Sequence, residues 1–425
     1  MTETRQSTRR DYAPVAAAAA VIASCACIAA LGIIATAGGN DQRSFHLRSV
    51  MTLRDNFPDV DVVNMHTATG PLYHLLVAGL SGLFAMGTAA TQVVGALFSA
   101  ALAALAVWHT RTVPTLYGRV LAVAPLLLSA YFWQSSLWMM TDDAAILFAL
   151  AALMALLAGT TTRHQLAAGL LIAAAIATRQ TFVWTLIPAC ATCLYSLRSQ
   201  PPLIRASAIG RVAGPGAVVL AILVMLWGGL TPPAMRGFNA FSYSWVSLSF
   251  GFAVAAIFVT PIVASTLTEV DVRGRLPLAS AIGVVVALPA IIFPSSATTA
   301  PDDSRRGGVV WSAVSKFPEV GERSALLPAL AFVGGFACTI LYFMLTRQVA
   351  ILLATSLAAV AVVTSAGSQL YQKYMELPIG MFALIAIVSL YGSGRIHRTW
   401  PLLFLAILQA AMSAGIVGLP ILRAL

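Results

Sequence analysis

Two aspartate-containing segments carry side chains that could activate a hydroxyl group. Asp41 follows directly on the first apolar run, where its carboxylate could take a proton as a general base. Asp142 and Asp143 open a later apolar run, and two adjacent carboxylates could hold a divalent cation or orient sugar hydroxyls. The alternatives are a solvated loop carboxylate for Asp41 and a helix N-cap for the aspartate pair.

The cation Arg179, followed by Gln180, lies between two apolar runs. The runs together cover residues 166–197, roughly 48 Å of helix at about 1.5 Å per residue, which is more than one span needs. The segment is therefore expected to form a tight hairpin with Arg179 near its apex. A guanidinium at membrane depth costs roughly 2.5–3.5 kcal/mol and suits a phosphate partner. The alternative is an arginine that snorkels to the interface.

A second cation, Lys373, stands near the start of a late apolar run, next to Tyr374. We predict that Lys373 joins Arg179 and Gln180 in binding a phosphate, although tyrosines at such a position are also typical of aromatic belts. No group of residues requires a metal, and the adjacent aspartates leave a divalent cation as an alternative. The predicted substrate contacts are His46, His66, Tyr73 and Tyr374.

The amino-acid composition indicates the class of protein to which these residues belong. Of 425 residues, 59% are hydrophobic and only 9% are charged, whereas soluble domains carry about 25% charged residues. The mean hydropathy is +0.87, so an all-α polytopic membrane protein in a lipid bilayer is expected. Despite the net charge of +10, the basic residues are scattered singly, which argues against nucleic-acid binding. The five cysteines lie in apolar runs and predict packing.

The distribution of basic residues in short loops predicts the topology. The basic loops can share the cytoplasmic side only if one early run does not cross, and residues 70–87 are the candidate for a re-entrant or interfacial helix. This gives about 13 crossings, with the N-terminus inside and the C-terminus outside. The expected organisation is a cytoplasmic tail (1–12), a catalytic module (13–230) with outer loop 38–69, and a second module (231–425) with outer loop 294–324.

On this topology most acidic residues lie outside, although acidic residues contribute little to orientation. They number 11 of the 15 Asp and Glu residues, Asp41 and the Asp142-Asp143 pair among them. The working face is therefore expected to be extracytoplasmic.

The order of these motifs resembles that of the GT-C class of integral-membrane glycosyltransferases, over about residues 30–185. It is most similar to the dolichyl-phosphate-glucose α-1,2-glucosyltransferase family. That family has an Asp-Glu pair followed by Phe-His, a Thr-rich Pro-Gly-Leu-Tyr stretch, Tyr-Thr-Asp, and Arg-Gln-Thr-Asn with a nearby Trp. The corresponding residues here are Asp41-Gln42 with Phe45-His46, Thr67 to Tyr73, Thr141-Asp142, and Arg179-Gln180-Thr181-Phe182 with Trp184, with Gln42 and Phe182 as departures.

The resemblance implies an inverting transferase that uses a polyprenyl-phosphate sugar as donor and a lipid-linked glycan or cell-envelope polysaccharide as acceptor. The Ala- and Arg-rich, Lys-poor composition indicates a bacterial inner membrane, with the site facing the periplasm. A transporter or flippase for a lipid-linked sugar is the main alternative, but transport sites lie near the bilayer midplane, whereas these ionisable residues cluster at span ends. A non-catalytic scaffold would leave them unexplained.

Overall fold

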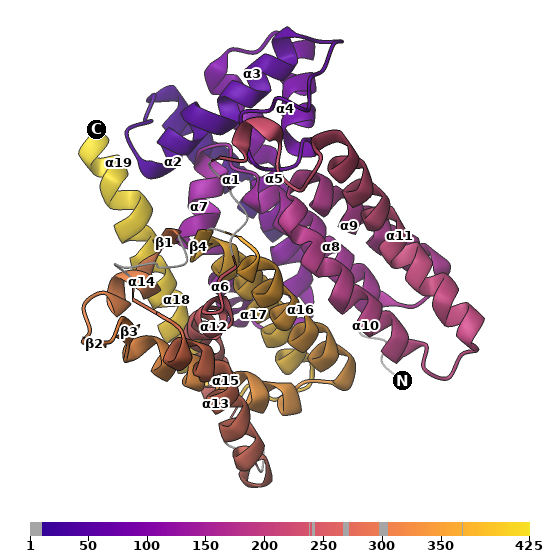
Figure 1. Cartoon of the computed structure of the whole chain (residues 1–425), viewed down its shortest axis with the longest axis vertical. Coiled ribbons are helices and arrows are strands. Elements are labelled where there is room, and N and C mark those ends of the chain that lie inside the picture. The colour runs from indigo at the N-terminus through magenta and orange to yellow at the C-terminus, as the bar shows by residue number, and fades with distance from the viewer. Residues whose placement is uncertain (1–10, 238, 240–242, 267–271, 297–304, 368) are drawn as a thin grey trace, which may run out of the picture.

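The chain forms a bundle of helices in the computed structural model, which describes residues 11–425 apart from 238, 240–242, 267–271, 297–304 and 368 (Figure 1). Within the described residues, nine helices are long and apolar enough to cross a membrane. They are α1 (Ala13–Ala30), α5 (Thr88–His109), α11 (Pro202–Trp227), α12 (Ser247–Ala264), α13 (Leu276–Ile292), α15 (Leu326–Met344), α16 (Arg347–Ser365), α17 (Lys373–Gly392) and α18 (Trp400–Ser413), the last continued by η6 (Ala414–Gly418) and α19 (Leu419–Ala424).

A tenth candidate span is the pair α6 (Leu116–Leu127) and α7 (Ala130–Leu137), which meet at an angle of 69°. The chain is thus a polytopic helical membrane protein, as its composition predicts, with nine or ten candidate spans by length and composition in the part described. Three shorter helices follow α7, each connected by a brief turn. They are α8 (Asp142–Ala158), α9 (Thr162–Thr178) and α10 (Leu186–Ser196), with η3 (Gln180–Thr185) between the last two.

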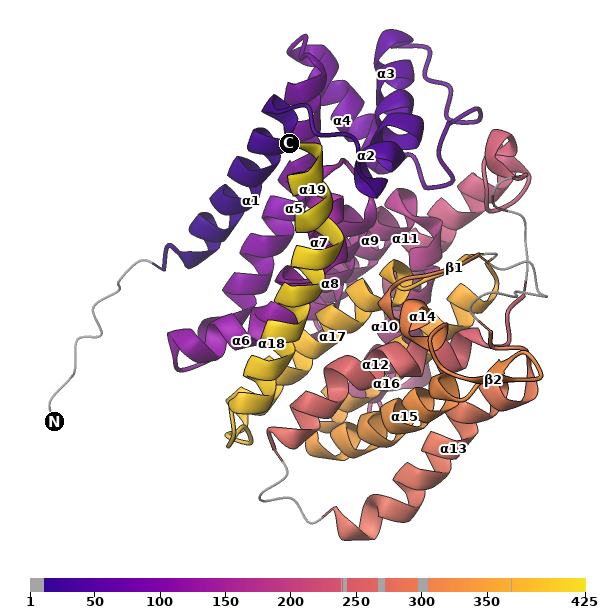
Figure 2. The same cartoon turned by 90° about the vertical axis from the view of Figure 1, so that its left-hand side faces the viewer.

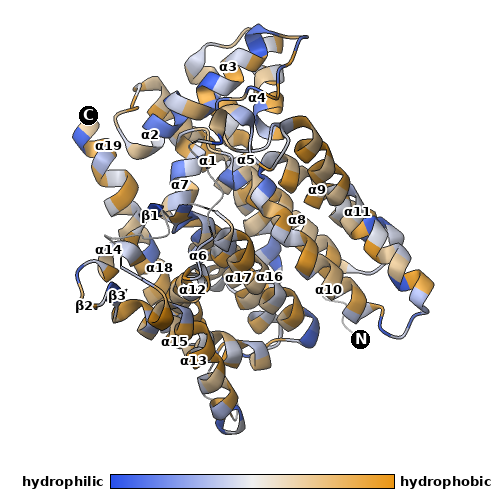
Figure 3. Cartoon of the chain, in the orientation of Figure 1, coloured by the Kyte–Doolittle hydropathy of each residue, from blue (hydrophilic) through white to orange (hydrophobic). Residues whose placement is uncertain are grey.

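Helix α17 lies at the centre of the bundle, whereas α1 and α11 lie at its periphery (Figures 1 and 2). Its 20 residues are apolar on every side, which is typical of a helix surrounded by other helices. Hydropathy colouring shows apolar ribbon through most of the bundle (Figure 3). Because α17 begins at Lys373, this central position fixes the predicted cation at one end of the bundle.

The basic loops lie together at one end of the bundle. There Arg119 pairs with Asp11 at 2.7 Å, Arg395 donates to the Met344 carbonyl, and the His397 amide donates to the Ser265 carbonyl. Short 3-10 turns lie in these loops, η2 (Thr110–Thr112) and η5 (Arg273–Arg275).

The first long connection, expected as a loop over residues 38–69, folds into a helix over most of its length. It is continuous through α2 (Ala37–Asp41), the π-helical turn η1 (Gln42–His46) and α3 (Leu47–Asp55). Thr36 begins the helix by accepting a hydrogen bond from the Gly39 amide at 3.0 Å. A Cβ atom at Gly38 would lie 2.5 Å from the Trp138 ring, so only glycine allows the helix to approach this closely.

The helix that follows, α4 (Leu72–Leu83), is about 18 Å long at about 1.5 Å per residue. A bilayer core is about 30 Å thick, so this length is too short for a crossing. The helix packs against α3 and α5, and Tyr73 is among its buried residues.

The second long connection, residues 294–324, carries short strands. Strand β1 (Arg305–Gly307) pairs in parallel with β4 (Gln369–Tyr371), directly before α17. The buried Trp311 of α14 (Val309–Val314) donates its ring N–H to the Leu370 carbonyl at 2.9 Å. Strands β2 (Glu319–Val320) and β3 (Arg323–Ser324) form a separate hairpin, and η4 (Pro233–Met235) lies in the connection from α11 to α12. Residues Asp302 and Asp303 lie outside the described residues.

Candidate functional site

Two ion pairs lie together at the end of the bundle opposite the basic loops. Lys373 Nζ lies 3.6 Å from Asp41 Oδ2, and Arg179 Nη1 lies 2.7 Å from Asp142 Oδ1. The four residues come from the end of α2, the start of α17, the turn after α9 and the start of α8. The fold therefore brings together two carboxylates and two cations that the sequence singled out, from segments far apart along the chain.

The ring of Tyr374 lies close to both cations. Arg179 Cζ is 5.1 Å from the ring centroid and Lys373 Nζ is 5.4 Å from it, both within range of cation–π attraction. The Tyr374 hydroxyl donates to Gln369 Oε1 at 2.7 Å, which fixes the ring. Tyr374, a predicted substrate contact, thus holds Arg179 and Lys373 near one another despite their like charge.

Exposure falls from the first ion pair to the second. The Asp41 side chain is 40% exposed and that of Lys373 is 21% exposed, against 11% for Arg179 and 9% for Asp142. Solvent screening is weaker for buried charges, so the Arg179–Asp142 pair is the more strongly coupled of the two. Asp41 and Lys373 are the members of the cluster that a molecule arriving from outside would meet first.

The two adjacent aspartates point in different directions, because successive residues on a helix lie on different sides of it. Asp142 contacts Arg179, whereas Asp143 is fully buried and donates its backbone N–H to Ser135 Oγ at 3.1 Å. Within the described part of the chain, no group of three or more His, Cys, Asp or Glu side chains is arranged to hold a metal ion.

The side chain of Gln180 connects separate segments of backbone. Its Nε2 atom donates to the Ala68 carbonyl at 2.5 Å and to the Leu230 carbonyl at 2.8 Å. Both amide hydrogens are thus occupied, and none remains for a phosphate oxygen. The predicted role of Gln180 as a phosphate-binding residue does not fit this geometry. The residue instead fixes the turn that presents Arg179.

His46 forms a buried pair with His74. Their rings are stacked at 5.3 Å, and His46 Nδ1 lies 3.0 Å from His74 Nε2. Burial lowers the pKa of His46 well below its ordinary value, and the positive charges of His74, Lys373 and Arg179 lower it further. Burial also lowers the pKa of His74 to about 4. Both imidazoles are therefore neutral at pH 7, and His46 adds no positive charge beside the two cations.

The remaining two predicted substrate contacts lie apart from the ion pairs. Tyr73 is fully buried and packs against Phe98, and a Cβ atom at Gly95 would lie 2.5 Å from its hydroxyl oxygen. His66 is half-buried, and its pKa is lowered by burial and by the charge of Arg48. Tyr73 therefore belongs to the core between α4 and α5, and His66 to the irregular segment after α3.

Three buried polar residues support the site and were not among the predicted site residues. Gln42 donates to Gln92 Oε1 at 2.9 Å, so an uncharged amide occupies the position beside Asp41. Glu376, one turn after Lys373, accepts hydrogen bonds from Ser129 at 2.7 Å and Gln372 at 2.6 Å. His74 and Glu376 stand within or next to apolar runs, where a polar residue usually has a specific partner. This placement in the sequence could have identified His74 and Glu376 as residues with specific partners.

No protein-family model, curated protein or solved structure matches this chain.

Proposed function

We propose that the protein is an inverting glycosyltransferase that moves a sugar from a polyprenyl-phosphate donor to a lipid-linked glycan or a cell-envelope polysaccharide. The observation that carries the proposal is the cluster of Asp41, Lys373, Arg179 and Tyr374 at one end of the bundle. A half-exposed carboxylate beside two cations provides both functions that such a reaction needs, a base for the acceptor and positive charge for the leaving phosphate.

In the proposed reaction, Asp41 takes the proton of the acceptor hydroxyl as its oxygen forms a bond to the anomeric carbon. The bond from that carbon to the phosphate oxygen breaks in the same displacement, which inverts the configuration. The polyprenyl phosphate leaves with the bonding electron pair, and Arg179 and Lys373 stabilise its charge. A phosphate is already a good leaving group, so electrostatic stabilisation can replace a general acid. This scheme requires no cofactor.

Donor binding and base activation are coupled through Lys373 in this proposal. Without donor, its ammonium lies 3.6 Å from the Asp41 carboxylate, which is longer than a hydrogen bond. The monoanionic phosphodiester of the donor would compete for Lys373 and leave the carboxylate free to accept a proton. The base would then be available only when the donor is in place.

The proposed membrane arrangement has thirteen crossings. The nine candidate spans, the α6–α7 pair, α8, α9, and α10 together with the η3 turn that runs directly into it would each connect the two ends of the bundle. The basic loops meet at one end, which the positive-inside rule assigns to the cytoplasm. The ion-pair cluster would then face the periplasm of a bacterial inner membrane. Helix α4, at 12 residues, would lie at the interface without crossing.

A transporter or flippase for a lipid-linked sugar is the alternative. Such a protein would be expected to keep its charged substrate contacts near the bilayer midplane. The ion pairs described above instead involve the first residue of α17, the first residue of α8 and the residue after α9. This placement at helix ends favours surface chemistry.

The deciding experiment is incubation of the purified protein with a panel of polyprenyl-phosphate sugars and an envelope-lipid extract as acceptor. Consumption of one donor, with release of polyprenyl phosphate and loss of the activity in Asp41→Asn, supports the proposal. Movement of a labelled lipid-linked sugar across proteoliposomes without any donor consumption would favour the transporter instead.

A further inference from the structure

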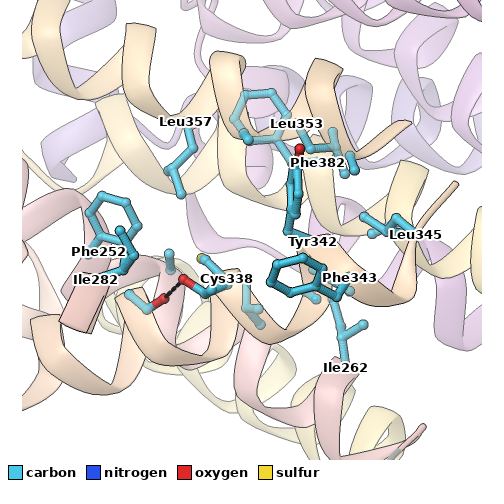
Figure 4. A pocket seen from close by; sticks show the side chains of 18 of the residues that line it. Phe252, Ile262, Ile282, Cys338, Tyr342, Phe343, Leu345, Leu353, Leu357 and Phe382 are labelled. Carbon is cyan, nitrogen blue, oxygen red and sulfur yellow. Dashed lines mark hydrogen bonds between the residues drawn. The ribbon is translucent and has the colours of Figure 1, made fainter. Parts of the chain in front are cut away.

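A cavity of about 330 Å³ lies between helices α12, α13, α15, α16 and α17, away from the ion-pair cluster (Figure 4). Its volume falls in the range of sites for small molecules and cofactors. The lining is almost wholly hydrocarbon, and its aromatic members include Phe252, Tyr342, Phe343 and Phe382. The Thr339 hydroxyl donates to the Gly335 carbonyl of its own helix at 2.8 Å, so it offers no hydrogen to a ligand. Such a cavity suits an alkyl chain.

Most residues that line the cavity lie in the half of the bundle that carries the basic loops, whereas Phe252 and Ile379 lie beyond the midpoints of α12 and α17. Helices α13 and α16 begin at this end, and they line it with Leu278 and Ile282 and with residues 350–357. Helix α15 ends there and lines it with Tyr342 and Phe343. From Arg347 to Leu357 the helix rises roughly 15 Å at about 1.5 Å per residue, which is about half of the roughly 30 Å hydrocarbon core. The cavity thus has the depth of one bilayer leaflet.

Two of the side chains that line the cavity are also exposed at the outer surface of the bundle. Leu278 is 48% exposed and Ile282 is 36% exposed, both on α13 at the outside of the bundle. In a membrane this surface faces lipid. A hydrocarbon chain could therefore enter sideways from the same leaflet, without passing through water.

Two arginines stand over the aromatic rings at the mouth of the cavity. Arg275 Cζ lies 4.5 Å from the Phe343 ring centroid, and Arg347 Cζ lies 5.0 Å from the Tyr342 ring centroid. Both arginines are exposed, and both rings line the cavity. In the sequence, the three connections at this end of the bundle, residues 265–275, 345–347 and 393–399, contain five arginines and two acidic residues, and the two acidic residues lie outside the described residues. The rim is therefore positive, at the level where lipid headgroups lie.

We infer that this cavity binds an anionic glycerophospholipid of the leaflet at the basic end, with an acyl chain among the apolar residues and the phosphate on Arg275 and Arg347. Charge complementarity selects this occupant, because arginine holds phosphate oxygens by two parallel hydrogen bonds. The site lies at the opposite end of the bundle from Asp41, and it does not depend on the proposed glycosyltransferase activity. A donor whose phosphate reaches Arg179 would use a different region of the protein.

The test is native mass spectrometry of delipidated protein titrated with phosphatidylglycerol or phosphatidylcholine. We expect one phosphatidylglycerol to bind per chain, with weaker binding of phosphatidylcholine. Replacing both arginines, R275Q with R347Q, should weaken binding of phosphatidylglycerol about 30-fold, since each basic residue near a lipid surface contributes about fivefold. The matched control is R111Q with R198Q, because these exposed arginines also stand over rings, at 3.8 and 4.4 Å, but the rings, Trp108 and Tyr195, do not line the cavity.

A second pair of variants tests the cavity itself. Ala354 and Ala358, one turn apart on α16, are both exposed, but of the two only Ala354 lines the cavity. Ala354→Trp should abolish binding of phosphatidylglycerol, and Ala358→Trp should leave it unchanged. Equal binding by both, no loss in the arginine double variant, or displacement of the lipid by equimolar polyprenyl phosphate would each overturn the inference. The arginine variants change only exposed residues, so the test stands even if Ala354→Trp fails to fold.

Discussion

The Lys373 ammonium lies 3.6 Å from the Asp41 carboxylate, so the cation that begins the central helix is paired with the carboxylate that ends α2. The distance is too long for a strong hydrogen bond, and both side chains are partly exposed, so the pair contributes about 1 kcal/mol or less to stability. Either residue can therefore exchange its partner for a substrate group at low cost.

Asp41→Asn should keep the fold and the affinity for donor but lower turnover by about two to four orders of magnitude, because the amide cannot accept the proton of the acceptor. Donor affinity should be unchanged or higher, since Lys373 loses its competing carboxylate. Single-turnover rates and donor binding would be measured side by side. The control is Asp55→Asn at the end of α3, where the carboxylate is exposed and pairs only with Arg54 among the described residues. Near-normal turnover would remove Asp41 from the mechanism.

Arg179→Ala should lower both stability and activity, because it leaves the buried Asp142 carboxylate without its 2.7 Å partner. Breaking a buried pair costs about 3–5 kcal/mol. The double variant Arg179→Gln with Asp142→Asn should recover most of that stability, since no buried charge remains unpaired, but it should not recover donor binding. Thermal unfolding and donor titration of the three proteins separate these roles. Normal donor binding by the stable double variant would mean that Arg179 only neutralises Asp142.

Arg179→Lys should weaken donor affinity and turnover although it keeps the charge. Lysine cannot reproduce the planar pair of donors that allows a guanidinium to contact a carboxylate and a phosphate at once. The measurement is donor affinity alongside the salt dependence of binding, which should stay the same if the charge persists. An affinity equal to that of the wild type would show that only the charge matters.

Gln180→Ala should reduce thermal stability more than donor affinity. The change leaves the carbonyls of Ala68 and Leu230 without their hydrogen-bond donor, at a cost of about 1–3 kcal/mol for each group that stays buried. Donor affinity measured well below the unfolding temperature should change little. If affinity fell strongly while stability did not, Gln180 would have to contact the donor directly.

Acidification should destabilise the protein through the His46–His74 pair. Each histidine has a folded-state pKa below its ordinary value of 6.5, to about 4 for His74, so the unfolded chain binds more protons below pH 6.5. Stability should be full above about pH 6.5 and fall as the pH drops toward 4, by up to about 1.4 kcal/mol per pH unit for each histidine. Unfolding temperatures of the wild type and His74→Phe would be compared, with a shallower slope expected in the variant. His164→Phe, at the opposite end of the bundle, serves as the control.

The sequence was sufficient to predict a helical membrane protein and to single out Asp41, Arg179, Lys373 and Tyr374. These residues interrupt or border apolar runs, and a charged group there costs energy unless it has a function or a partner. Their pairing was not predictable, because each ion pair joins segments that meet only through the packing of several helices. The helix over Ala37–Asp55 was also missed. Its α3 segment buries only one side, with Val50 and Leu53 inward, so it has no continuous apolar run.

Residues from both expected modules meet at the site, so the two ion pairs form at different times during synthesis. Arg179 and Asp142 belong to the first half of the chain and can neutralise each other as soon as α8 and α9 have been inserted. Lys373 is synthesised much later, with α17. A nascent chain that stops before β4 would thus contain the Arg179–Asp142 ion pair but leave the Asp41 carboxylate without Lys373. Formation of the Asp41–Lys373 pair would mark the point at which insertion of the central helix has succeeded.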